Sequence, residues 1–275
     1  MPRIWGGSRL KEAFGWEGDE FLGEAWLAYD ENQIARGALQ GRPLKEAVQA
    51  FGRRLLGDWV LRRYGLELPL LVKYLDAGTW LSVQVHPNDA FAHQVEAATG
   101  FHGKNEAWVI LDAEPGAKIV YGVRQEVSPE AFEKAAREGK VERYLNYVPV
   151  TPGDVIYIPA GTIHAMGPGI LAYEVQQRSD LTYRIYDYGR GRPLHLEKAL
   201  KVAQLKPTPV QKGRVDRDVF LRTPFFTLSK AESKACAPRD RFSILTRTDT
   251  LEPSVLLPPG TCFGPLPGQW IAASL

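Results

Sequence analysis

The sequence places four potential metal-binding side chains at the ends of strand-like runs. In LSVQVHPND (residues 81–89) apolar residues alternate with polar ones, so Gln84 and His86 point to the same face of a strand. Glu106 opens the run EAWVIL, and His164 follows PGDVIYIPAGTI. Imidazole nitrogens with carboxylate and amide oxygens form a donor set that divalent metals of borderline softness accept. The four residues therefore predict a metal centre, provided that three strands bring them together.

The runs around these residues predict a mainly β fold. Runs rich in β-branched and aromatic residues, broken at Gly, Pro or Asp, are typical of strands. They are LPLLVKYL, TWLSVQVH, EAWVILDA, AKIVYGV, YVPV, DVIYIPA, ILAYEVQQ and LTYRIYDY. Many short strands at close spacing favour a sandwich, a barrel or a jelly roll.

Helical patterns are fewer. Residues 43–63 carry one apolar stripe at helical spacing, and a second helix is predicted after Ser128, a capping residue that is followed by Pro. The run PLHLEKALKVAQL predicts a third helix. Residues 206–214, KPTPVQKGR, form the best candidate linker. We therefore expect a metal-binding domain over 1–205 and a small β domain over 206–275.

Two segments match the motifs of the cupin fold. GTWLSVQVH has the layout of the first motif, with Gln84 where that motif usually has His. GDVIYIPAGTIH, which ends at His164, matches the second motif at each position. Cupins are jelly rolls whose metal lies inside the barrel, where these strands meet.

One departure from the cupin pattern concerns the acidic ligand. The acid usually follows the first histidine pair within a few residues, whereas Glu106 stands 20 positions after His86. The intervening insertion contains His93, His102 and Lys104.

The chain resembles the short bacterial type of mannose-6-phosphate isomerase, a family of the cupin superfamily. The resemblance rests on LVKYLDAGTWLSVQVHPND, GKNEAWVIL, PGDVIYIPAGTIHA and TYRIYDYGR, in this order, with WGG and GEAW near the start. It covers residues 5–205, and the rest of the chain resembles a shortened form of the family's second small β domain. The resemblance implies a cupin jelly-roll barrel with added helices and a small C-terminal β domain.

The same resemblance implies a zinc enzyme that interconverts mannose 6-phosphate and fructose 6-phosphate through an enediol or enediolate. Carried over by motif, the metal ligands are Gln84, His86, Glu106 and His164. Oxygen and imidazole ligands also accept Mn, Fe or Co, so the residues alone leave the metal open.

Charged residues near the motifs are candidates for catalysis and substrate binding. Arg184 in TYRIYDY is similar to the family's active-site arginine, and Lys104 matches the lysine before the metal-binding acid. Isomerisation needs a base to move a proton between neighbouring carbons, and a cation to stabilise the charge that builds on oxygen. Lys104 ranks first as the base, and His102 and Glu174 are alternative bases and predicted substrate-binding residues. Lys73 is unusual inside the strand LLVKYL, and it is either a substrate-binding residue that reaches the pocket or a partner of Glu24 or Asp76.

Composition excludes several classes of partner. The formal net charge is +2, with no long run of one sign and no basic stripe, so we expect no nucleic-acid partner. The start of the chain lacks the apolar core of a secretory signal, and no segment offers the roughly 20 apolar residues of a membrane span. The cytoplasm is the default location. Cys236 and Cys262 have no metal-ligand spacing, and we expect no disulfide framework.

Two other functions are compatible with the metal motif. Two histidines and one carboxylate with open positions are the signature of iron(II) oxygenases. A non-catalytic sugar-binding cupin would keep the metal without turnover. Gln84 as a fourth ligand, with Lys104 and Arg184 nearby, favours the isomerase with its sugar-phosphate substrate. The residues do not indicate an oligomeric state.

Overall fold

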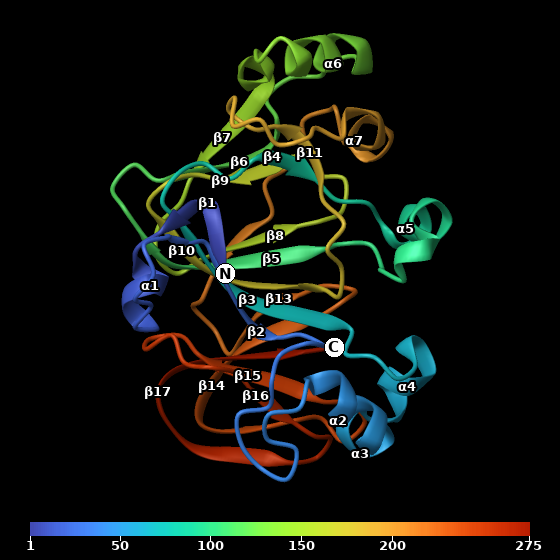
Figure 1. Ribbon diagram of the computed structural model, residues 1–275, viewed down its shortest axis with the longest axis vertical. Helices are drawn as coiled ribbons and strands as arrows, with labels where there is room; N and C mark the ends of the chain where they lie inside the picture. Colours follow the sequence, from blue (N-terminus) through green and yellow to red (C-terminus); the bar gives the residue numbers. More distant parts are fainter.

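Three β-sheets form the framework of the protein (Figure 1). The computed structural model describes all of residues 1–275. A seven-stranded sheet contains, in spatial order, β1 (Pro2–Gly7), β3 (Leu70–Ala77), β10 (Ile170–Gln177), β5 (Glu106–Ala113), β8 (Asp154–Ile158) and β12 (Lys212–Arg214), with β2 (Glu24–Ala28) beside β3. A five-stranded sheet contains β11 (Tyr183–Tyr186), β4 (Val83–Val85), β9 (His164–Met166), β6 (Lys118–Val123) and β7 (Leu145–Pro149). The third sheet contains β13 (Val219–Arg222), β14 (Thr227–Cys236), β17 (Cys262–Ser274), β15 (Ser243–Arg247) and β16 (Val255–Leu257).

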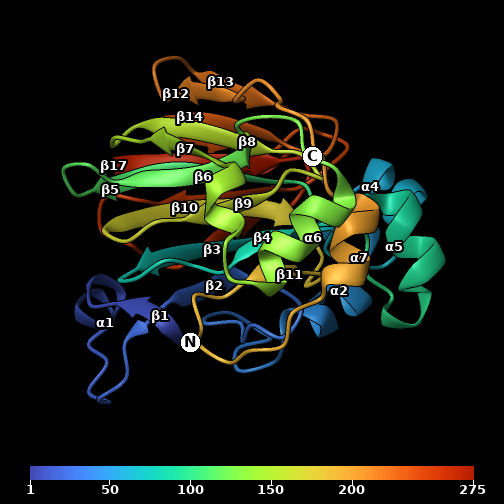
Figure 2. The same ribbon diagram turned by 90° about the horizontal axis from the view of Figure 1, so that it is seen from above.

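The first two sheets face each other as the two halves of a jelly roll (Figures 1 and 2). Their facing sides share an apolar core that includes Trp108 and Ile110 of β5, Ile119 of β6 and Met166 of β9. Alternation along each strand sends these side chains inward, as the sequence runs predict. The predicted mainly β jelly roll is confirmed, although no strand pairing closes the two sheets into a continuous barrel.

Additional layers cover both outer faces of the jelly roll. Helices α6 (Pro129–Arg137) and α7 (Leu196–Val202) pack on the five-stranded sheet through Phe132 and Leu196, which share a core with Val120. The third sheet packs on the outer face of the seven-stranded sheet, where Tyr173 of β10 and Ile271 of β17 belong to one core. Figure 1 shows these layers stacked from α6 down to β17. The facing sides of the jelly roll are therefore enclosed between two supporting layers.

The single helix predicted over residues 43–63 is wrong. The structure divides this segment at Gly52 and Gly57 into α2 (Leu44–Phe51), α3 (Arg53–Leu56) and α4 (Asp58–Tyr64). Gly57 has a φ of 90°, and a Cβ there would lie 2.2 Å from the carbonyl oxygen of Asp240. The close approach of this turn to the C-terminal region requires glycine, and the required φ interrupts the helix.

The C-terminal sheet is fastened to the jelly roll by hydrogen bonds as well as by apolar contacts. The predicted linker over 206–214 ends in β12, whose residues pair with β8. The hydroxyl of Tyr74 in β3 donates to the carbonyl of Arg247 in β15 (2.7 Å). Thr246 Oγ1 donates to the hydroxyl of Tyr173 (3.2 Å). The two parts of the chain thus share one contact surface.

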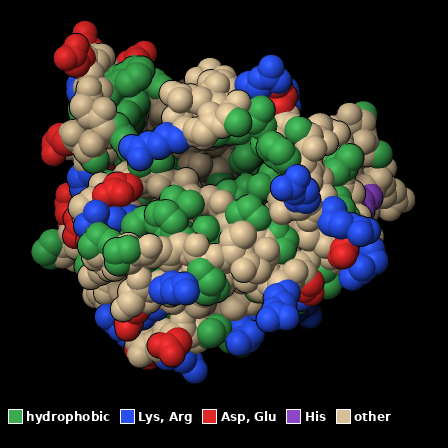
Figure 3. Space-filling view, turned by 90° about the horizontal axis from the view of Figure 1, so that it is seen from below, with side chains coloured by type: hydrophobic (Ala, Val, Ile, Leu, Met, Phe, Trp, Pro, Cys, Tyr) green, Lys and Arg blue, Asp and Glu red, His purple; other side chains and the backbone are tan.

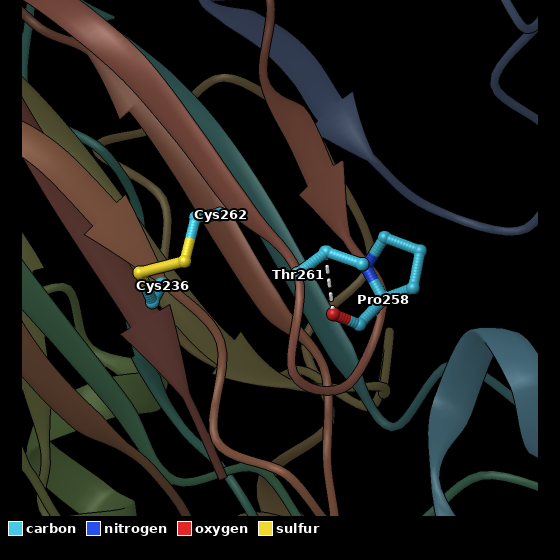
Figure 4. Close-up of a disulfide and its surroundings, with 4 residues drawn as sticks. All are labelled: Cys236, Pro258, Thr261 and Cys262. Atoms are coloured by element: carbon cyan, nitrogen blue, oxygen red, sulfur yellow. Dashed lines mark hydrogen bonds between the residues drawn. A yellow bond between two sulfur atoms is a disulfide. The ribbon is translucent and has the colours of Figure 1, made fainter.

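The two cysteines form a disulfide, contrary to the expectation from the sequence. Cys236 of β14 and Cys262 of β17 are direct register partners and are bonded to each other. Figure 4 shows the bridge beside the turn in which Thr261 hydrogen-bonds to the carbonyl of Pro258. The pairing depends on antiparallel strands that lie far apart in sequence, which the cysteine spacing does not reveal.

Lys and Arg side chains are scattered over the face in Figure 3, separated by acidic, apolar and uncharged groups. None of the helices has the length and apolar character that crossing a membrane demands. The remaining helices are short: α1 (Arg9–Ala13) and α5 (Asp89–Val95).

Candidate metal centre and active site

The four predicted ligands converge between the two facing sheets. Gln84 lies in β4 and is the register partner of His164, which begins β9. His86 directly follows β4, and Glu106 begins β5 in the opposite sheet. Glu106 Oε2 lies 3.3 Å from His86 Nε2, and Glu106 Oε1 lies 3.2 Å from His164 Nε2. These three side chains, the His–Glu–His cluster, are almost fully buried.

Backbone carbonyls orient both imidazoles toward Glu106. His86 Nδ1 donates to the carbonyl of Leu181 (2.9 Å), and His164 Nδ1 donates to the carbonyl of Thr162 (2.8 Å). In the neutral rings, each Nε2 then carries a lone pair that faces a carboxylate oxygen, and His164 Nε2 also has the amide of Gln84 at 3.3 Å. His86 Nε2 and Glu106 Oε1 are accordingly buried without a hydrogen-bond partner, and the polar partner of Glu106 Oε2 is the ammonium group of Lys104, at 3.1 Å. Converging lone pairs are costly unless a cation lies among them, so the donor set fits a divalent metal ion.

Neighbouring charges keep the cluster in the protonation state that binds metal. Burial, together with Lys104, lowers the pKa of His86 to about 3, so this ring is neutral. Burial alone would raise the pKa of Glu106, but Lys104 and the histidines outweigh burial and hold this pKa well below its usual range. A neutral imidazole and an ionised carboxylate are the ligand forms.

Gln84 lies at the edge of the cluster. Its Nε2 is 3.3 Å from His164 Nε2, and its Oε1 accepts a hydrogen bond from Ser82 Oγ at 3.5 Å. A half-turn of the amide exchanges oxygen and nitrogen, which would direct Oε1 toward the other three donors. The position of Gln84 therefore suits either a fourth ligand or a hydrogen-bond donor to one.

A cavity of about 300 Å³ opens beside the cluster, within the size range of small-molecule sites. Lys104 connects the cavity with the His–Glu–His cluster, because its Nζ lies 3.1 Å from Glu106 Oε2 and its side chain lines the cavity. Most of the remaining wall is polar or charged: Arg3, Glu24, Lys73, Ser82, Gln84, Glu174, Asp180, Thr182, Arg184 and Arg192. The cavity thus offers several cations to a small polar ligand next to the metal donors.

Lys73 reaches the cavity and is paired there with acids. Its Nζ lies 3.0 Å from Glu174 Oε1 and 4.0 Å from Glu24 Oε2. Burial lowers the pKa of Lys73, but the two carboxylates outweigh burial and raise this pKa above its usual range. Trp108 Nε1 donates to Glu174 Oε2 (2.7 Å) and fixes that carboxyl group. The lysine inside a buried strand is explained by this charge balance.

Arg184 brings a second group of charges to the cavity. It lies in β11, where it is the register partner of Gln84, and its Nη1 donates to the carbonyl of Pro193 (2.7 Å). Its Nε is buried without a partner. Burial and the nearby Arg192 lower the pKa of Arg184, and Asp187 holds Arg192 in place (2.8 Å). Two guanidinium groups on one wall favour an anionic ligand between them.

Known proteins of similar sequence share one name. The family model for the catalytic domain of type I phosphomannose isomerase matches residues 2–108. A mannose-6-phosphate isomerase of Streptococcus mutans is 38% identical over 245 residues, which cover 83% of this chain and 75% of that protein. The chain belongs to the mannose-6-phosphate isomerase family. A second relative, the probable mannose-6-phosphate isomerase GmuF of Bacillus subtilis, is 35% identical over 83% of this chain and 76% of its own length.

Solved structures extend the family likeness to the whole chain. The mannose 6-phosphate isomerase of Bacillus subtilis superposes with a TM-score of 0.77 at 27% identity, covering 100% of this chain and 96% of that one. A zinc-bound mannose 6-phosphate isomerase superposes with a TM-score of 0.71 at 18% identity, over 99% and 94% of the two chains. The second likeness shows that the fold is shared. The C-terminal sheet is part of the superposed region.

Within this family member, the structure brings together all but one of the site residues predicted from the sequence. The four predicted ligands meet, and Lys73, Lys104, Glu174 and Arg184 line the adjoining cavity. His102 lies apart. Its ring contacts Glu67 and His93, and it does not line the cavity. His102 lies in the loop before β5, whose first residue is Glu106, and its ring is held by Glu67 and His93 away from the cavity.

Three residues of the cavity wall, Arg3, Glu24 and Arg192, were not among the site residues predicted from the sequence. Arg192 lies in the run GRGRP, which reads as a loop, and its place depends on the ion pair with Asp187. Arg3 and Glu24 come from the first strands, a region without a clear pattern, and they pair with each other at 3.1 Å. For Glu24 the sequence offered two signals, the family-like run GEAW and a possible pairing with Lys73.

Proposed function

We propose that this protein interconverts mannose 6-phosphate and fructose 6-phosphate, with one divalent metal ion bound by the His–Glu–His cluster. One observation carries the proposal: buried, unpartnered imidazole and carboxylate atoms lie at the wall of a cavity lined by lysine and arginine. The names of the relatives and of the zinc-bound structural neighbour support the same reaction and favour zinc.

The residues that would hold the ion are His86, Glu106 and His164, with Gln84 as the fourth donor. When bound, the ion supplies a positive charge that stabilises negative charge developing on the substrate's oxygen atoms. The carbonyls that accept from Nδ1 of both histidines hold the rings in position whether or not a substrate is present. The site is therefore preorganised by backbone groups of the jelly roll.

Arg184 and Arg192 are the proposed anchors for the substrate's anionic groups. The phosphate takes no part in bond making, but fixing it places the sugar carbons against the catalytic groups. The unpartnered Nε of Arg184 is a free donor for this purpose or for the enediolate. We assign Arg184 to the reacting end, because it neighbours Gln84 in the sheet.

Lys104 is the proposed base. The reaction moves a proton from carbon 2 to carbon 1 of the sugar, while a hydroxyl proton moves from oxygen 2 to oxygen 1. Lys104 lies against Glu106 and on the cavity wall, so its amine can carry a proton beside the metal donors.

Glu174 is the competing base, and Lys73 positions it. Burial and the neighbouring Glu106 raise the pKa of Glu174, which makes its carboxyl group a better proton acceptor than an ordinary glutamate. Replacing Lys104 by Met and, separately, Glu174 by Gln shows which residue is the base. The variant that lacks the base loses turnover, whereas the variant that lacks only a positioning group mainly raises KM.

A coupled assay for fructose 6-phosphate formed from mannose 6-phosphate tests the proposed function. We expect turnover under strictly anaerobic conditions, because isomerisation consumes no oxygen, and a large loss of kcat/KM when unphosphorylated mannose replaces the substrate. Activity that vanishes without oxygen would instead indicate the oxygenase. Sugar-phosphate binding without turnover, at full metal loading, would indicate a sugar-binding cupin.

A further inference from the structure

A second group of metal-binding atoms lies outside the cavity, in the insertion between His86 and Glu106. Asp89 and His93 are four residues apart on α5 and therefore lie on one face of this helix. His102 lies in the loop that follows. The donor atoms of the three side chains are within 4.8 Å of one another. We call these three residues the surface histidine cluster.

The hydrogen bonds of His102 resemble those of a metal-bound histidine. Its Nε2 contacts the carboxylate of Glu67, and its Nδ1 lies 3.0 Å from His93 Nε2. A histidine that donates one ring N–H to a carboxylate is the arrangement found behind metal ligands, since it fixes the tautomer and raises the basicity of the other nitrogen. In this tautomer, Nδ1 of His102 carries a lone pair directed at His93.

Asp89 is also held in a suitable orientation. Its Oδ1 accepts from the backbone amide of Gly103 (2.9 Å) and from Gln177 Nε2 (3.0 Å). These contacts fix the carboxylate while Oδ2 makes no hydrogen bond, so one oxygen is supported and the other is available. Two imidazoles and one carboxylate match the ligand preferences of zinc, cobalt and nickel.

We propose that the surface histidine cluster binds a second divalent transition-metal ion through His93 Nε2, His102 Nδ1 and a carboxylate oxygen of Asp89. Two nitrogens of a tetrahedral site with bonds of about 2.0–2.1 Å stand about 3.3 Å apart, so the two rings must separate by only a few tenths of an ångström. His93 is exposed, so its ring can move by this distance. Its ring proton can also move from Nε2 to Nδ1, which frees Nε2 for the metal. Water completes the coordination.

The ion would connect the two ends of the insertion. Asp89 follows His86 by three residues, and His102 precedes Lys104 by two. The backbone amide of Lys104 already donates to the carbonyl of Pro87 (2.9 Å). A metal link beside this hydrogen bond stabilises the segment that delivers Lys104 to the cavity.

Metal stoichiometry tests the inference. Protein first loaded with one equivalent of Zn²⁺ is dialysed against increasing Zn²⁺, and bound zinc is measured by elemental analysis. We expect the native chain to reach two ions, His93→Ala to stop at one, and Gln94→Ala to reach two. Gln94 is the matched control because it is an exposed neighbour on the same helix with no side-chain hydrogen bond. A native chain that stops at one ion would overturn the proposal, as would an unchanged second affinity in His93→Ala.

Glu67→Gln tests the supporting contact separately. The amide removes the carboxylate behind His102 but leaves all three ligands, so we expect the second ion to bind about 10–100-fold more weakly than in the native chain. A second equivalent of Zn²⁺ should also raise the midpoint of thermal unfolding of the native chain. The same addition should leave the midpoint of His93→Ala unchanged. Equal affinity in Glu67→Gln and the native chain would exclude the role assigned to Glu67.

Discussion

The His–Glu–His cluster and the surface histidine cluster use the same donor types in different surroundings. In the His–Glu–His cluster all three side chains are buried, and the rings are held by backbone carbonyls of the jelly roll. In the surface histidine cluster His93 is exposed, and the support comes from side chains such as Glu67. Buried lone pairs without partners favour a bound metal ion, whereas exposed groups can hydrogen-bond to water instead.

This difference predicts the order of affinity and the consequence of binding. A preorganised, desolvated site holds its ion tightly and acts on the substrate cavity beside it. A site on a short helix and a loop binds more weakly and acts on the stability of its own segment. Substitutions of single residues in the two clusters and in the cavity separate the effects of the two sites.

His164→Ala should abolish both metal retention and turnover. The change removes one ligand from the buried cluster and leaves Glu106 without its second imidazole, so we expect kcat/KM to fall by about 10³-fold or more. Zinc content after gel filtration and the coupled assay check this. Circular dichroism shows whether the fold persists. Retained zinc with normal turnover would place the metal elsewhere.

Arg184→Lys should separate catalysis from metal binding. Lysine keeps the positive charge but loses the forked donors, and we expect kcat to fall by about 10²-fold while zinc content stays at the native level. Arg217→Lys serves as a control, because Arg217 is exposed and far from the cavity residues in sequence. Loss of zinc in Arg184→Lys would show that this arginine supports the cluster instead of the substrate.

Gln84→Ala tests the edge of the buried cluster. Three stronger donors remain, so we expect zinc affinity to fall by about 10-fold, much less than in His164→Ala. Competition with a chromogenic chelator measures the change. An unchanged affinity would show that Gln84 only donates a hydrogen bond, as it does toward His164 in the structure.

His93→Ala should have the smallest effect on the buried ion. The side chain belongs only to the surface histidine cluster, so the first zinc should remain bound with native affinity under the same chelator competition. A weaker first ion in His93→Ala would mean that the two clusters are coupled through the insertion, and the contrast drawn between them would fail.

The sequence predicted that these side chains meet because two cupin spacings determine where the strands place them. Glu106 was expected beside the histidines despite the long insertion, since it opens a clear strand next to Lys104, and it lies 3.2–3.3 Å from both rings. His102 was predicted to face the substrate cavity, but it does not line the cavity. The sequence near a ligand does not show in which direction the side chain of a loop residue points. The pairing with Glu67 depends on α4 and the chain after it, which are distant in sequence.

The fold was predicted where alternation was strong and missed where tertiary contacts decide. Residues 43–63 have a helical stripe, but the carbonyl of Asp240 forces a glycine turn at Gly57. Arg192 enters the cavity only because Asp187 holds it, and the disulfide needs the register of β14 and β17. Such long-range contacts leave no periodic signal in a single sequence.

Zinc titration of the metal-free protein, with turnover and bound zinc measured in the same samples, shows whether isomerisation depends on the buried ion. We expect no isomerisation without metal and a linear rise of kcat to its maximum at one zinc per chain. A second zinc should then bind without raising kcat further. Full activity after complete metal removal would show that the buried ion is not needed for isomerisation, and a maximum reached only at two zinc ions per chain would show that one ion is not sufficient.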